Sequence, residues 1–399
     1  MRIAGYTLLL CMLALMGLGL VVITSIGDVQ GGRLFGDPDH FWHHQLLFGV
    51  VALGVCAVVA AVPTRLWFRR EVAWAIVALS LFGLVAVHLP GIGRTANGSA
   101  RWIRLPGLLV QPSEFIKVGS MVVLAAWTGA RGRNLSRFRE GALVPALWIG
   151  AVVFGLLLEP DLGSSLMLAF LSGVVLYLAG TRFWHLVLLA VVAAVALGGF
   201  LLTDANRMHR VTSVVARYLH GGGRDDASTA LSQHDKNEAY QVEMGLAAFR
   251  AGGVRGVGLG RSLFKQRYLP ENHTDFIFAM VGEELGLVAT TACLLLFLAM
   301  ACAGFYLAYR APDASTFVLA AGLSLQLCFS AAVNVAVVTG IAPTKGLAMP
   351  FLSYGGSSLI VCAATVGFLL GIAFRPGAPR VPALPDDARC LPATDLWND

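Results

Sequence analysis

Long apolar runs, separated by short polar connections, dominate the chain. About 20 consecutive apolar residues are needed to cross the hydrocarbon core of a bilayer. Ten segments approach or exceed that length: roughly 5–26, 43–62, 72–90, 112–129, 141–158, 162–180, 184–203, 276–308, 315–340 and 355–374. The pattern predicts an all-α polytopic membrane protein with ten transmembrane helices.

Composition agrees with the pattern. Of 399 residues, 57% are hydrophobic and only 13% are charged, whereas soluble domains carry roughly 25% charged residues. The net charge of +6 comes largely from arginines in short loops, which argues against nucleic-acid binding.

The distribution of arginines among the loops predicts the orientation of the protein in the membrane, because cytoplasmic loops are enriched in arginine and lysine. A cytoplasmic N-terminus places the arginine-rich loops 63–71 and 130–140 inside. We therefore predict one transmembrane domain over 1–375, with a large extracytoplasmic loop, 204–275, between the seventh and eighth helices. The proline-rich segment 376–399 is predicted to be a disordered cytoplasmic tail.

Two segments on the outer side stand out. The loop 91–111 carries three arginines, Arg94, Arg101 and Arg104, against the charge rule. Within the large loop, residues 239–250 have the spacing of an amphipathic helix, and such a helix can lie on a membrane surface.

The most informative polar cluster is His273-Thr-Asp275, directly before the eighth apolar segment. Asp275 has two readings: it caps the helix, or it serves as a general base at the membrane boundary. Helical geometry places Glu283 about 80° from Asp275 and Glu284 about 180° away. We therefore expect Glu284 to pair with a different helix.

Further polar clusters occur in outer connections. Glu114 and Lys117 are helix neighbours that can pair in a cavity. Arg101 and Trp102 suit an anionic headgroup. The remaining clusters are the 159–163 turn, which holds Glu159 and Asp161, and the segments 343–346 and 353–358, the second of which contains Ser357. Their shared side predicts a site that faces outward.

Seven short motifs together carry a family resemblance. They are residues 100–103 (ARWI), 111–117 (QPSEFIK), 159–163 (EPDLG), 269–278 (LPENHTDFIF), 282–286 (GEELG), 343–346 (PTKG) and 353–358 (SYGGSS). With them the chain resembles the SEDS proteins (shape, elongation, division and sporulation), which polymerise peptidoglycan glycan strands. The last two motifs look like the division and sporulation branch (FtsW and SpoVE), with the elongation branch (RodA) as runner-up.

The resemblance implies ten transmembrane helices, cytoplasmic termini and lipid II as substrate. It implies that Asp275 is the essential catalytic acid residue, and that a class B penicillin-binding protein and other divisome proteins are partners. The expected location is the bacterial cytoplasmic membrane at the division septum.

The chemistry of lipid II agrees. Asp275 is expected to deprotonate the acceptor 4-hydroxyl, with undecaprenyl pyrophosphate as the leaving group. Candidate substrate-binding residues are Glu114, Lys117, Arg101, Trp102, Asp161, Lys265, Arg267, His273 and Ser357, while Glu283 and Glu284 are expected to be structural. A divalent cation can share the pyrophosphate charge. A lipid II flippase and a division scaffold are the alternatives.

Overall fold

A computed structural model describes residues 1–34, 36–37, 39–96, 99–105, 108–159, 161–202, 233–264, 274–342 and 347–375. Each predicted apolar segment coincides with a helix: α1 (Arg2–Leu34), α2 (His40–Ala61), α4 (Arg70–Ala86), α5 (Pro112–Arg131), α6 (Val144–Leu158), α7 (Leu162–Leu178), α8 (Phe183–Leu202), α12 (Ile277–Tyr309), α13 (Ala314–Val338) and α14 (Gly356–Phe374). A short helix, α3 (Thr64–Trp67), follows α2, and one turn each of 3₁₀ and π-helix joins α5 to α6.

Six helices in the described residues are long and apolar enough to cross a membrane: those within Arg2–Gly27, His40–Ala61, Arg139–Leu158, Ile277–Tyr309, Ala314–Val338 and Gly356–Phe374. They establish a mostly helical, polytopic membrane protein. The count of ten spans stays a prediction.

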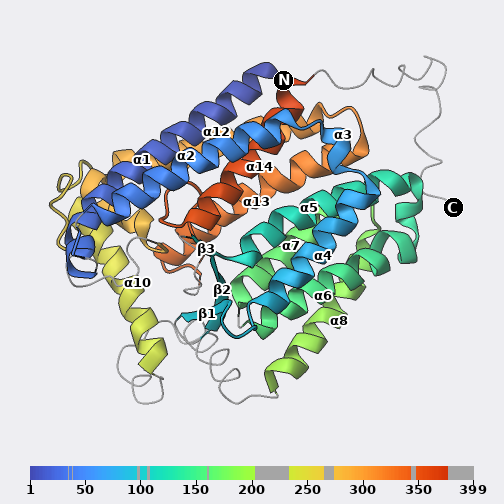
Figure 1. Cartoon of the computed structure of the whole chain (residues 1–399), viewed down its shortest axis with the longest axis horizontal. Helices are drawn as coiled ribbons and strands as arrows, with labels where there is room; N and C mark the ends of the chain where they lie inside the picture. The colour runs from blue at the N-terminus through green and yellow to red at the C-terminus, as the bar shows by residue number, and fades with distance from the viewer. Residues whose placement is uncertain are drawn as a thin grey trace.

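Side-by-side helices form the body of the molecule (Figure 1). The contacts join α2 to α14, α1 to α12 and α13 to both α12 and α5. The start of α1 meets the end of α14, where the rings of Tyr6 and Phe374 are 5.1 Å apart. The strands and the helix α10 lie at the opposite end (Figure 1).

The expectation of an all-α fold is wrong in one segment. The outer loop 91–111 contains an antiparallel sheet of three strands, β1 (Gly93–Ala96), β2 (Ser99–Leu105) and β3 (Leu108–Val110), in that spatial order. Trp102 of β2 lies opposite Arg94. β-Branched and aromatic residues favour such pairing, and the sheet leads directly into α5.

The predicted amphipathic helix is confirmed as α10 (Gln233–Gly252), and it packs on α12. Its small residues allow close contact, since a Cβ on Gly245 would lie 3.1 Å from Cδ1 of Phe276. Further along, the ring of Phe249 meets that of Phe278 edge-on at 5.7 Å. The predicted tail, 376–399, lies outside the described residues.

Candidate functional site

Two side chains from other parts of the fold hold the main chain at Asp275. The hydroxyl of Ser353, which precedes α14, donates to the carbonyl oxygen of Thr274 at 2.6 Å. The amide Nδ2 of Asn334 on α13 donates to the carbonyl oxygen of Asp275 at 3.0 Å. The position of the half-buried Asp275 is therefore set by α13 and by the segment before α14.

The same two side chains also hold the segment before α14. Asn334 Nδ2 donates to the carbonyl oxygen of Leu347 at 2.8 Å, and the amide of Met349 donates to Ser353 Oγ at 2.8 Å. Asn334 is 1% exposed, so its two donated bonds form away from solvent. Asn334 and Ser353 thus clamp two chain segments together.

The structure places Asp275 one residue before the N-cap position of α12. Phe276 occupies that position, and its side chain has no acceptor for a capping bond. Both expectations for Asp275, a helix cap and a general base, therefore stay predictions.

Ser357, in the first turn of α14, connects this region to β3 and α5. Its hydroxyl donates to the carbonyl oxygen of Leu109 at 2.8 Å and accepts from the amide of Gln111 at 3.2 Å. Ser357 follows Ser353 by four positions in the chain, a reach of at most about 14 Å. One short segment therefore holds both the start of α12 and the start of α5.

Glu114 and Lys117 form the ion pair that their spacing suggests. Lys117 Nζ lies 2.7 Å from Glu114 Oε1, and both side chains are largely buried. The pair lies in the first two turns of α5, which begins at Pro112. These charges therefore sit at the sheet end of the helix bundle, where Ser357 also lies.

Arg101 and Trp102 are neighbours on β2, so their side chains point to opposite faces of the strand. Arg101 Nε donates to the carbonyl oxygen of Glu159 at 3.2 Å. The sheet is thereby linked to the turn between α6 and α7, and the headgroup site at Arg101 and Trp102 stays a prediction.

The acids of that turn have different environments. Asp161 caps α7, because its Oδ1 accepts from the amide of Ser164 at 3.1 Å. Glu159 is 1% exposed, and neither carboxylate oxygen has a hydrogen-bond partner within the part of the chain that the structure describes. Burial raises the pKa of Glu159 to about 8, Asp161 adds to the rise, and Arg101 opposes it.

Glu283 holds a loop against α12, and Glu284 holds helix α1 against it. Glu283 Oε1 accepts from the amide of Leu263 at 2.8 Å and its Oε2 from the hydroxyl of Ser262. Glu284 Oε1 accepts from Ser25 of α1 at 2.6 Å, so it pairs with a different helix, as the helical geometry predicts.

Three predicted substrate-binding residues, Lys265, Arg267 and His273, lie outside the described residues. Sequence reasoning missed Asn334, although a lone asparagine inside an apolar run is a signal that was available. It also missed that the carboxylate of Glu159 has no hydrogen-bond partner in the described residues, because the sequence motif shows two acids but not the hydrogen-bond donors around them.

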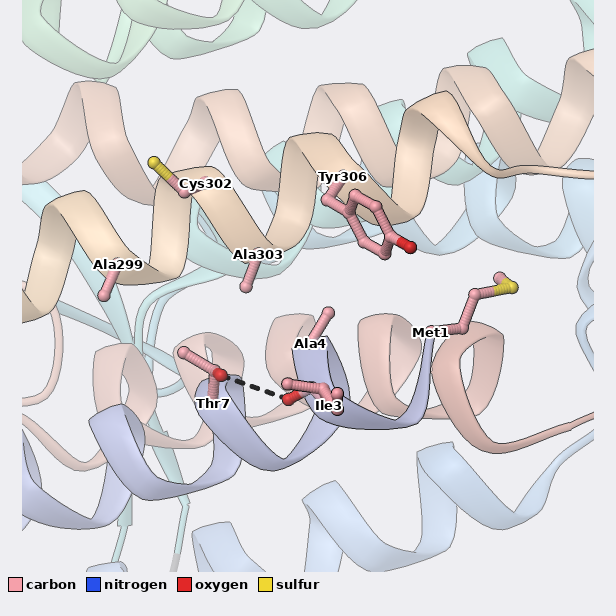
Figure 2. Close-up of a pocket in the computed structure, with 8 residues that line it drawn as sticks. All are labelled: Met1, Ile3, Ala4, Thr7, Ala299, Cys302, Ala303 and Tyr306. Carbon is pink, nitrogen blue, oxygen red and sulfur yellow. Dashed lines mark hydrogen bonds between the residues drawn. The ribbon is translucent and has the colours of Figure 1, made fainter.

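A groove of about 440 Å³ lies between the start of α1 and the second half of α12. Figure 2 shows Ala4 and Thr7 facing Ala303 and Tyr306 across it. Small and apolar side chains dominate its walls, and it lies at the end of the bundle away from the sheet (Figure 1). The groove is therefore separate from the polar clusters.

Comparisons with known proteins agree with the arrangement. The family model for FtsW, RodA and SpoVE, described as "Cell cycle protein", matches residues 6–375. A "Probable peptidoglycan glycosyltransferase FtsW" of Geobacter sulfurreducens is 37% identical over 93% of this chain and 96% of its own length. "Stage V sporulation protein E" of Bacillus subtilis is 34% identical over 92% and 95%.

A solved structure described as "Structural coordination of polymerization and crosslinking by a peptidoglycan synthase complex" superposes with a TM-score of 0.72. Its identity is 26%, over 92% of this chain and 97% of that one. Sequence and fold agree along nearly the whole membrane region, and the chain belongs to the FtsW/RodA/SpoVE family.

Proposed function

We propose that the protein is a peptidoglycan glycosyltransferase that polymerises lipid II into glycan strands during septal cell-wall synthesis. The names of the FtsW relatives support the activity and the septal role. The observation that carries the mechanism is the main-chain clamp on Asp275. A general base must be held in place relative to the hydroxyl that it deprotonates.

In this mechanism Asp275 removes the proton from the 4-hydroxyl of the acceptor sugar. The oxygen then attacks the anomeric carbon of the donor, and the bond to undecaprenyl pyrophosphate breaks. Cationic groups stabilise the charge on the leaving group. Four residues are candidates for this role. Lys117 and Arg101 lie at the sheet end of the bundle, and Lys265 and Arg267 belong to the large loop, outside the described residues.

The site faces the outer side of the cytoplasmic membrane, where the substrate and the partner's crosslinking domain meet. A class B penicillin-binding protein is the proposed partner, supported by the synthase complex that shares this fold. The other proposed ligands of the substrate are Glu114, Trp102, Asp161, His273 and Ser357.

A flippase is less well supported, because transport needs polar groups through the depth of the membrane. The buried Glu114–Lys117 pair lies in the first two turns of α5 and not at its middle.

The decisive experiment measures glycan-chain synthesis from lipid II by purified protein with its cognate transpeptidase. Asp275→Asn keeps the size of the side chain but removes the base, so polymerisation should fall by about 10²- to 10⁴-fold. Thermal unfolding should be unchanged, which separates lost chemistry from lost folding. Polymerisation at the wild-type rate by Asp275→Asn would rule out the assignment. Lipid translocation without chain growth by the wild type would instead identify a flippase.

A further inference from the structure

Helix α12 is interrupted at Gly286, whose backbone angles are φ 77° and ψ −171°. The chain that follows α10 fills the interruption. The amide of Val257 donates to the carbonyl oxygen of Glu283 at 2.9 Å, and the amide of Leu287 donates to that of Gly253 at 2.9 Å. A Cβ on Gly286 would lie 2.3 Å from the amide nitrogen of Gly256, so only glycine fits.

The surroundings of α12 change at this interruption. Residues 277–284 are all buried by neighbouring protein. After Gly286, large apolar side chains are exposed, including Leu287, Val288 and Leu295. An exposed apolar face on a membrane-spanning helix faces lipid, so lipid contact begins at the interruption. Residues 287–309 extend for about 35 Å, enough to cross a core of about 30 Å.

The loop bonded to α12 at this level is residues 253–264, here called the collar. It presents Val254, Leu259 and Leu263 to the outside, each half or more exposed. The amide of Val288 donates to the carbonyl oxygen of Val254 at 3.4 Å. The apolar surface of the collar is therefore continuous with the lipid-facing surface of α12.

Two basic residues of the collar, Arg255 and Arg261, are also exposed. Apolar side chains next to arginines match the boundary between acyl chains and phosphates, because the guanidinium pairs with phosphate oxygens while its neighbours leave water. If the collar were surrounded by water instead of lipid, three large apolar side chains on one short loop would be exposed to solvent.

We propose that the collar is a membrane-binding element. Its three apolar side chains insert among the phospholipid headgroups around α12, and its two arginines bind the lipid phosphates. The occupant is bilayer lipid, because the collar surface continues a helix face that already contacts lipid. This inference does not depend on Asp275 or on the proposed reaction.

The test measures the immersion of a nitroxide label in liposomes that contain the full chain. Labels are placed by Leu259→Cys or Leu263→Cys, in a background where Cys302 and Cys390 are replaced by serine. Collisions with oxygen report the apolar layer, and collisions with a water-soluble nickel chelate report solvent. Both collar labels should meet oxygen more often, and nickel less often, than a Tyr240→Cys label on α10.

A Leu295→Cys label on α12 gives the fully lipid-exposed reference. Collar labels as accessible to nickel as the Tyr240→Cys label would overturn the proposal. Dipolar broadening that disappears on dilution with unlabelled protein would identify a second copy of the chain as the occupant, and would overturn it as well.

The role of the arginines is tested with vesicles of phosphatidylcholine, alone and mixed with phosphatidylglycerol. The anionic lipid should draw the labels deeper, and the double variant Arg255→Gln/Arg261→Gln should lose that response. Equal immersion of the labels in the wild type and in the double variant, in both kinds of vesicle, would show that the arginines do not bind lipid phosphates.

Discussion

The start of α12 and the turn between α6 and α7 each bury acidic residues at the sheet end of the bundle. The hydrogen bonding of these acids differs between the two regions. Glu283 receives hydrogen bonds from Ser262 and Leu263. Glu159 is equally buried, but its carboxylate has no partner in the described part of the chain. The difference shows that the hydrogen-bond donors around a buried acid, and not its burial alone, decide whether the fold depends on its carboxyl group.

The largest expected effect comes from Glu159. Its folded-state pKa of about 8 lies above its ordinary value of 4.5, so the folded protein holds this proton more tightly than the unfolded chain. Stability is therefore lost as the pH rises from about 4.5 to about 8. The glutamine of Glu159→Gln cannot ionise, so this variant should not lose stability in that pH range. At pH values above the folded-state pKa of Glu159, the variant should be more stable than the wild type by up to ~5 kcal/mol.

Thermal unfolding of wild type and Glu159→Gln on both sides of that pH window checks this prediction. The variant should be the more stable protein on the alkaline side only. Parallel pH profiles for the two proteins would show that Glu159 is already paired or solvated.

Glu283 should behave in the opposite way. Glu283→Ala leaves the hydroxyl of Ser262 and the amide of Leu263 without their acceptor, at a cost of about 3 kcal/mol. Thermal unfolding measures the loss, with the exposed Glu71→Ala of α4 as control, for which a change within about 0.5 kcal/mol is expected. An equal, small effect of both substitutions would remove the contrast with Glu159.

Asn334 tests whether the start of α12 needs its clamp for catalysis. Asn334→Ala releases the carbonyl of Asp275, and misplacement of the base should lower kcat by about 10- to 100-fold with less change in KM. Ser330→Ala, also buried and one turn earlier on α13, is the matched control. If the activity of Asn334→Ala falls only as much as the amount of folded protein falls, Asn334 has a structural role alone.

The smallest effect is expected at Asp161. Asp161→Ala removes the cap of α7 and should cost about 1 kcal/mol, whereas Asp161→Asn retains a capping oxygen. If Asp161 acts only as a cap, Asp161→Asn restores both stability and polymerisation. If its charge also serves the substrate, stability returns but polymerisation does not.

Sequence patterns located the helices well, because each apolar run must be buried or face lipid along its whole length. The sheet at 93–110 was missed, although an arginine- and tryptophan-rich run followed by Pro106-Gly107 and a second apolar run is a hairpin signal. The charges of that loop favoured a headgroup reading over a strand reading.

The interruption at Gly286 was beyond sequence reasoning for a different reason. A glycine inside a helix is tolerated in most contexts. Here the break forms only because the main chain of residues 253–258 supplies the missing hydrogen bonds. The clamp at Asn334 depends in the same way on segments that meet only in the folded protein.

The interruption of α12 also makes the preceding part of the helix a spacer of fixed length. Between Asp275 and Gly286, residues 277–285 rise by about 14 Å along the helix, and neighbouring protein buries residues 277–284. If the collar lies at the lipid phosphates, as proposed, a membrane-anchored substrate would meet Asp275 with a group that projects beyond its own phosphates. Under the proposed function, the length of this helical spacer, and not the thickness of the surrounding bilayer, would select which part of the substrate reaches Asp275.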